Sequence, residues 1–262
     1  MGLFGSKRLY KSTGMHGQVD VSEEKGIRSL HLGSITVQSS MKVSAPDELV
    51  LEYTRCMMGF LLFHADPRQI VTIGLGGGSV VKWIYRYLPN AINLVVEINP
   101  QIVQVARAMF CVPSDDDRLQ ILLEDGACYV AGRNEVADVM LVDGYDGYEI
   151  VEQLNTEAFY QHCRDALTQD GVLVVNLWGN HRLFDTWLQR IERVFDGHVA
   201  CLPAQTKGNV TVLAFKRSPG NPKWTDLRDR AKALEQQYGL EFPVFVSQLG
   251  KLNMHSDKRL LI

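Results

Sequence analysis

The chain has 262 residues, of which 46% are hydrophobic and 22% are charged, and this length accommodates one α/β domain with an appendage or two modest domains. The formal net charge of −3 excludes a global field for binding nucleic acid, and no apolar run is long enough to span a membrane. Five cysteines without a Cys-x-x-Cys pair argue against a disulfide framework or a zinc site and for a reducing, cytoplasmic location.

The N-terminal region, residues 1–45, is predicted to form a small β domain. Alternating apolar residues and the placement of glycines favour short strands at 18–21, 29–32 and 35–38. From Asp47 onward the spacing of apolar residues is helical, with Tyr53 on the apolar face. We therefore place a second domain at residues 46–262.

The second domain alternates strand and helix. Strands are expected at 70–73, 94–96, 119–123, 139–142, 172–177 and 210–215, and helices at 79–87, 102–109, 157–167, 184–195 and 224–238. This alternation predicts a mostly parallel sheet, with ligands at the carboxyl ends of its strands. A further strand at 199–202 is separated from 210–215 by a short polar turn, so these two strands should form an antiparallel hairpin at one edge.

A glycine-rich turn follows the first strand of this sheet and contains Gly74, Gly76 and Gly78. Glycines allow positive φ and let a ligand lie against bare backbone, and the helix that begins near Ser79 directs free amide N–H groups toward that ligand. The turn could also serve only tight packing, but its place directly after a buried strand favours a binding site.

Acidic residues end three successive strands, at Glu97, Asp125 and Asp143. One such residue could simply be a surface terminus, and Asp143 and Asp146 could cap turns. Three of them would instead surround a nucleoside with hydrogen-bond acceptors, whereas a nicotinamide site needs only the first. Ser79 also departs from the third glycine of the dinucleotide-binding pattern. The set favours an S-adenosyl ligand with a cationic sulfonium.

These motifs resemble those of the spermidine synthase (polyamine aminopropyltransferase) family, from about residue 18 to residue 215. The resemblance implies a Rossmann-like fold of the S-adenosylmethionine-dependent methyltransferase type, preceded by a small N-terminal β domain. It also implies a donor, decarboxylated S-adenosylmethionine or S-adenosylmethionine itself, and no metal. The residues that would bind the donor are Gln18, Gln38, Gly74, Gly76, Gly78, Glu97, Asp125 and Gly126.

The same resemblance implies transfer of an aminopropyl group to a polyamine or another amine acceptor, by a homodimer or higher homo-oligomer. Asp143 would be the catalytic base, and Asp146 a second catalytic residue that binds the amine. Tyr145, Tyr148 and Gln205 would bind the acceptor, although the two tyrosines could equally well only pack.

The sequence departs from the family pattern mainly on the acceptor side. Gly77 stands where the family has an aspartate that contacts the amine end of the donor, and neither usual proline follows Asp146. Because a carboxylate at residue 77 would repel an intact methionine carboxylate, its absence leaves room for a methyltransferase as an alternative. A non-catalytic, nucleoside-binding member of the family is the third hypothesis.

Overall fold

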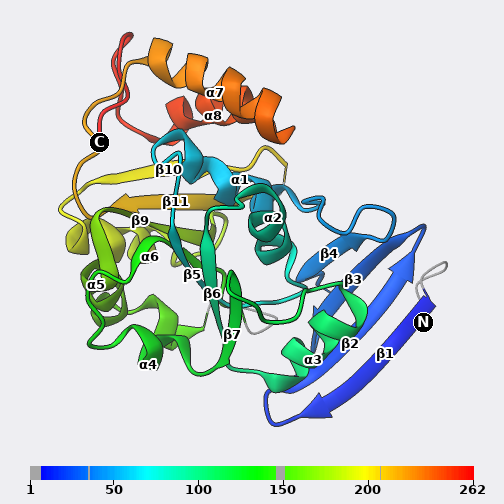
Figure 1. The fold of residues 1–262 in the computed structure, drawn as a ribbon. Coiled ribbons are helices and arrows are strands. Elements are labelled where there is room, and N and C mark those ends of the chain that lie inside the picture. Colours follow the sequence, from blue (N-terminus) through cyan, green and yellow to red (C-terminus); the bar gives the residue numbers. More distant parts are fainter. Residues whose placement is uncertain (1–6, 35, 146–150, 207) are drawn as a thin grey trace.

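The computed structural model describes residues 7–34, 36–145, 151–206 and 208–262. A seven-stranded sheet forms its centre, in the order β10-β11-β9-β8-β5-β6-β7 (Figure 1). Its strands are β5 (Gln69–Ile73), β6 (Ile92–Glu97), β7 (Leu119–Leu123), β8 (Ala137–Val142), β9 (Leu167–Trp178), β10 (Val199–Pro203) and β11 (Asn209–Phe215). Strands β5 to β9 are parallel, and the β10–β11 hairpin is antiparallel at the edge. The predicted fold class is confirmed.

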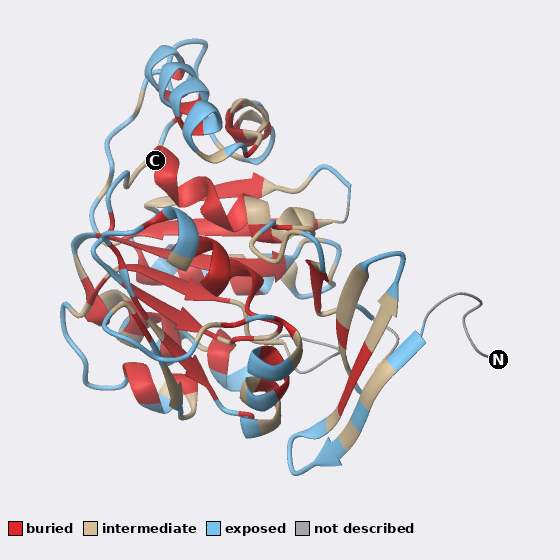
Figure 2. Ribbon diagram, turned by 45° about the vertical axis from the view of Figure 1, so that its right-hand side comes forward, coloured by how far each residue is buried: buried red, intermediate tan, exposed pale blue. Residues whose placement is uncertain are grey.

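The central strands read as continuous apolar runs because both faces of the sheet are covered. Successive side chains of a strand point to opposite faces, and β8 shows the consequence: Val139 and Leu141 join one core cluster, Met140 and Val142 the other. All four are fully buried, and Figure 2 shows the sheet as the most continuously buried part of the fold.

Helices on the two faces supply the rest of these clusters. The first cluster contains side chains of α1 (Glu52–Met57), η1 (Met58–Leu62), α2 (Ser79–Tyr87), α7 (Trp224–Tyr238) and α8 (Phe242–Leu252). The second contains side chains of α4 (Gly126–Val130), η2 (Glu152–Asn155), α5 (Glu157–Ala166) and α6 (Phe184–Val194). Helix α8 was not expected from the sequence, and the helix expected from Asp47 begins only at Glu52.

The N-terminal strands form a separate antiparallel sheet, β1 (Lys7–Gly14), β2 (Gly17–Glu24), β3 (Ile27–Leu32) and β4 (Ser39–Lys42). Its inner face packs Val21, Leu30 and Met41 against α2 and α3 (Pro100–Met109). The strand expected at 35–38 is wrong for residues 36–38, and residue 35 lies outside the described residues; β4 instead pairs with β3 through Ser39 to Lys42 and so buries Met41. The domain boundary after residue 45 stays a prediction. Among the described residues, no helix is long and apolar enough to cross a membrane.

Candidate functional site

A cavity of about 710 Å³ opens at the carboxyl ends of β5, β6, β8 and β9. We call it the main cavity. Parallel strands present this edge to ligands because the connecting loops diverge there. The predicted site residues that line it are Gln38, Gly74, Gly76, Glu97, Asp125, Gly126, Asp143 and Tyr145. Eight residues spread over more than a hundred positions of sequence therefore face one space.

The glycine turn brings bare backbone to the wall of the main cavity. Gly74 has φ +91°, and a Cβ there would lie 2.5 Å from the backbone oxygen of Asp143, so no side chain fits at this position. Gly78 also has positive φ and precedes α2, but it does not line the cavity, and a Cβ there would meet the Val112 side chain. Only Gly74 and Gly76 of the three predicted glycines line the site.

Glu97, the last residue of β6, points a buried carboxylate into the main cavity. Its Oε2 accepts from the Leu75 backbone N–H at 2.9 Å and its Oε1 from the Asn99 N–H at 2.8 Å. Burial raises the pKa of Glu97, and these backbone hydrogen bonds oppose that rise. Each carboxylate oxygen can accept more than one hydrogen bond. The Glu97 carboxylate can therefore also accept hydrogen bonds from two vicinal hydroxyl groups of a ligand.

Asp125 follows β7 and combines a structural role with a place on the cavity wall. Its Oδ1 accepts from the N–H groups of Ala127 at 2.7 Å and Cys128 at 3.0 Å, which caps α4. Gly126 lies close behind it, and a Cβ there would be 2.5 Å from the Ile73 side chain. Because Gly126 has no side chain, the backbone at the start of α4 can lie close to the end of β5.

Asp143 follows β8 directly and lies half-buried at the main cavity. Its Oδ1 accepts from the Asn176 side-chain amide at 2.9 Å, and Asn176 in turn accepts from the Asn209 amide at 3.0 Å. Burial raises the pKa of Asp143, while hydrogen bonds from Asn176 and Tyr53 oppose the rise. A carboxylate with a raised pKa and fixed orientation is suited to accept a proton.

Tyr53, expected on the apolar face of a helix, also lines the main cavity. Its one hydroxyl proton has two acceptors within reach, the Gln38 carbonyl at 3.0 Å and the Asp143 carboxylate. Burial and the Asp143 charge raise the pKa of Tyr53, so the phenol stays protonated. The available signal was a tyrosine among aliphatic residues, because a buried phenol needs a hydrogen-bond partner.

Tyr145 lines the same space, and its hydroxyl donates to the Asn176 carbonyl at 3.1 Å. Burial, together with the charge of Asp143, raises the Tyr145 pKa. Next to it, the side chains of Trp178, His181 and Trp187 line one end of the main cavity, and His181 stacks on Trp187 at 4.5 Å between ring centroids. We call this the aromatic end.

Other predicted site residues are not brought into the main cavity. The Gln18 amide donates to Asp20 within β2, and Gln205 is exposed beside the β10–β11 turn, where its backbone N–H donates to Glu52. Neither lines the cavity. Asp146 and Tyr148 lie outside the described residues. No group of three metal-binding side chains occurs in the part of the chain that is described.

The space around Gly77 is filled by neutral groups. A Cβ at Gly77 would lie 2.6 Å from the Ser39 hydroxyl and 3.0 Å from the Phe110 ring. The hydroxyls of Ser39 and Ser79 are 3.2 Å apart, and both buried residues line the main cavity. The Ser39 hydroxyl therefore occupies the place toward which a side chain of residue 77 would project.

Comparison with known proteins identifies relatives over nearly the whole chain. The spermine/spermidine synthase domain family matches residues 50–222. The polyamine aminopropyltransferase of Chromobacterium violaceum is 48% identical, covering 94% of each chain, and that of Neisseria meningitidis serogroup A is 44% identical, covering 96% of each. A solved spermidine synthase in complex with the transition-state analogue AdoDATO superposes with a TM-score of 0.71 at 22% identity, over 93% of this chain and 88% of that one.

Proposed function

Because the chain belongs to the spermine/spermidine synthase family, we propose that its main cavity binds decarboxylated S-adenosylmethionine and transfers the aminopropyl group to an amine. The observation that carries this proposal is that the carboxylates of Glu97 and Asp143 both line the main cavity. The first carboxylate suits the ribose of a nucleoside. The second suits a reacting amine.

The donor half of the proposal rests on groups that match a nucleoside. The ribose hydroxyls would bind Glu97, and the adenine would lie near Asp125 and Gly126, with the sulfonium beside the turn at Gly74. The aminopropyl ammonium would then meet the Ser39 and Ser79 hydroxyls, which can accept hydrogen bonds from it. The sulfonium supplies the leaving group, a neutral thioether.

The chemical step requires a neutral amine. The acceptor nitrogen first gives up a proton, which the Asp143 carboxylate accepts. The neutral nitrogen then forms a bond to the aminopropyl carbon that is attached to sulfur, the carbon–sulfur bond breaks, and its electron pair remains on sulfur. Asn176 and Tyr53 hold this carboxylate in place, and alignment of the two reactants supplies much of the rate enhancement.

The acceptor is an amine that the aromatic end can receive. Trp178 and the Tyr145 ring would offer π faces to a cation, and Asp146 and Tyr148 remain predicted contributors. A polyamine fits this description, because its distal ammonium needs such a partner while its near nitrogen reacts. We further propose a homodimer or higher homo-oligomer, which sedimentation of the purified protein tests.

Calorimetry with three nucleosides tests the function. We expect methylthioadenosine to bind, and decarboxylated S-adenosylmethionine to bind more tightly than the intact form. A preference for the intact donor would favour methyl transfer, since the groups around Gly77 carry no negative charge that would repel a methionine carboxylate. Binding of methylthioadenosine without turnover of any amine would favour the non-catalytic alternative. Failure of all three to bind at micromolar concentration would contradict the proposal.

A further inference from the structure

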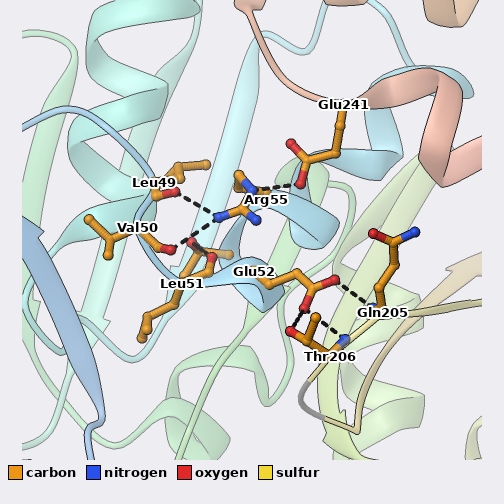
Figure 3. A network of polar contacts seen from close by, with 9 residues as sticks. Leu49, Val50, Leu51, Glu52, Arg55, Gln205, Thr206 and Glu241 are labelled. Carbon is orange, nitrogen blue, oxygen red and sulfur yellow. Dashed lines mark hydrogen bonds and ion pairs between the residues drawn. The ribbon is translucent and has the colours of Figure 1, made fainter.

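Glu52 is the first residue of α1 and the neighbour of Tyr53, and its carboxylate reaches across to the turn between β10 and β11. It accepts from the backbone N–H of Gln205, from the N–H of Thr206 at 3.0 Å, and from the Thr206 hydroxyl (Figure 3). These residues are more than 150 positions apart in sequence. One side chain thus satisfies three donors of two exposed residues, Gln205 and Thr206.

The turn leads directly to a wall of the main cavity. The Ala204 N–H donates to the Asn209 carbonyl at 2.8 Å, which closes the turn. Asn209 lines the cavity, pairs with Trp178 of the aromatic end and donates to Asn176, the partner of Asp143. On the other side, α1 carries Tyr53 into the same cavity. Glu52 therefore connects α1 with the turn between β10 and β11, and both lead to residues that line the main cavity near Asp143.

The electrostatics keep the Glu52 carboxylate available for this contact. Partial burial raises its pKa, but the hydrogen bonds from Thr206 and Gln205 and the nearby Arg55 charge lower the pKa overall. Arg55 itself has other partners: it donates to Glu241 at 2.7 Å and to the carbonyls of Leu49 and Val50 at 3.1 Å (Figure 3). The ionised carboxylate is thus bound by the turn rather than by the adjacent arginine.

We propose that Glu52 is a positioning residue, which holds Gln205 and Thr206 against α1. It would thereby set the shape of the aromatic end of the main cavity, where the amine acceptor is proposed to bind. The inference rests on the proposed aminopropyl transfer. Gln205 then acts through its backbone, and its side chain need not touch substrate. Glu52 should govern how well the acceptor binds, and it should leave the nucleoside site unchanged because Glu97, Asp125 and Gly74 lie at or after the ends of other strands, β6, β7 and β5.

Steady-state kinetics of the Glu52→Ala variant test the proposal. We expect the KM for the amine acceptor to rise about tenfold, equivalent to about 1.4 kcal/mol, while the affinity for methylthioadenosine stays at the wild-type value. Amide hydrogen exchange at Gln205 and Thr206 should become faster in the same variant. An unchanged acceptor KM in a variant with faster exchange would overturn the proposal.

Variants of Thr206, the hydrogen-bond partner of Glu52, test the same contact if the Glu52→Ala variant fails to fold. Thr206→Val removes the hydroxyl donor and should raise the acceptor KM by a smaller factor, whereas Thr206→Ser keeps the donor and should restore the wild-type KM. Glu241→Gln is the matched control, because it breaks the Arg55 ion pair in the same network without touching the turn, and its KM should stay unchanged. If the wild-type protein did not bind methylthioadenosine, the proposed function itself, rather than the role of Glu52, would be contradicted.

Discussion

Asn176 donates a hydrogen bond of 2.9 Å to the Asp143 carboxylate, and this bond ties the end of β8 to β9 at the main cavity. Because it stabilises the charged form of Asp143, it opposes the rise in pKa that burial causes. The Asn176→Ala variant should therefore raise the Asp143 pKa further. We expect the acidic limb of the kcat–pH profile to move to higher pH, and an unmoved limb would argue against Asp143 as the titrating base.

Asp143→Asn should separate binding from chemistry. Without a proton acceptor, kcat is expected to fall by about 10²–10⁴-fold, whereas methylthioadenosine should bind as it does to the wild type. Turnover at the wild-type rate in single-turnover assays with a panel of amines would remove Asp143 from the proposed role.

The same substitution should change stability in a pH-dependent way. Because the native state holds the Asp143 proton more tightly than the unfolded chain does, wild-type stability falls as pH rises from the ordinary carboxyl pKa through the raised one. The asparagine variant loses this dependence. Urea unfolding at pH 5 and pH 8 should show a greater gain in stability over wild type at pH 8, and an equal difference at both pH values would contradict this assignment.

Glu97→Gln should weaken nucleoside binding. The substitution removes the charge that would strengthen hydrogen bonds from ribose hydroxyls, and its amide group must face either the Leu75 or the Asn99 N–H. A charge-assisted hydrogen bond contributes about 1.5–3 kcal/mol, so methylthioadenosine affinity should fall by about one to two orders of magnitude. Glu124→Gln, at the end of the next strand and off the cavity wall, is the control; equal losses in both variants would count against a specific ribose contact.

Gly77→Asp tests the packing of the neutral pocket around Ser39. Its Cβ would lie 2.6 Å from the Ser39 hydroxyl, and forced overpacking costs about 1–3 kcal/mol. We expect a lower free energy of unfolding by urea. Adding Ser39→Gly should recover most of the loss, since it removes the side-chain atoms that the new Cβ would meet. Additive losses in the double variant would show that this contact is not the cause.

Much of the nucleoside half of the site could be inferred from sequence, because each residue there occupies a local position with its own signature. Gly74 and Gly76 follow a buried strand, and Glu97 and Asp125 each end one. In a parallel sheet those ends share one edge, so the chain order alone predicts that they meet. The strand that buries Met41 was misplaced by a few residues because local alternation does not specify which pair of strands will be packed.

The amino-acid sequence by itself determined the alternating architecture, the parallel sheet with its antiparallel edge, and the carboxylates at the strand ends, since periodicity and turn chemistry are local properties. Only the tertiary structure decided that Tyr53 meets Asp143, that Ser39 occupies the space beside Gly77, and that Glu52 binds the turn at Gln205. Those contacts join residues from separate elements whose separation depends on how helices and sheets pack. The pattern of residues within one helix or strand does not specify how close that element lies to another.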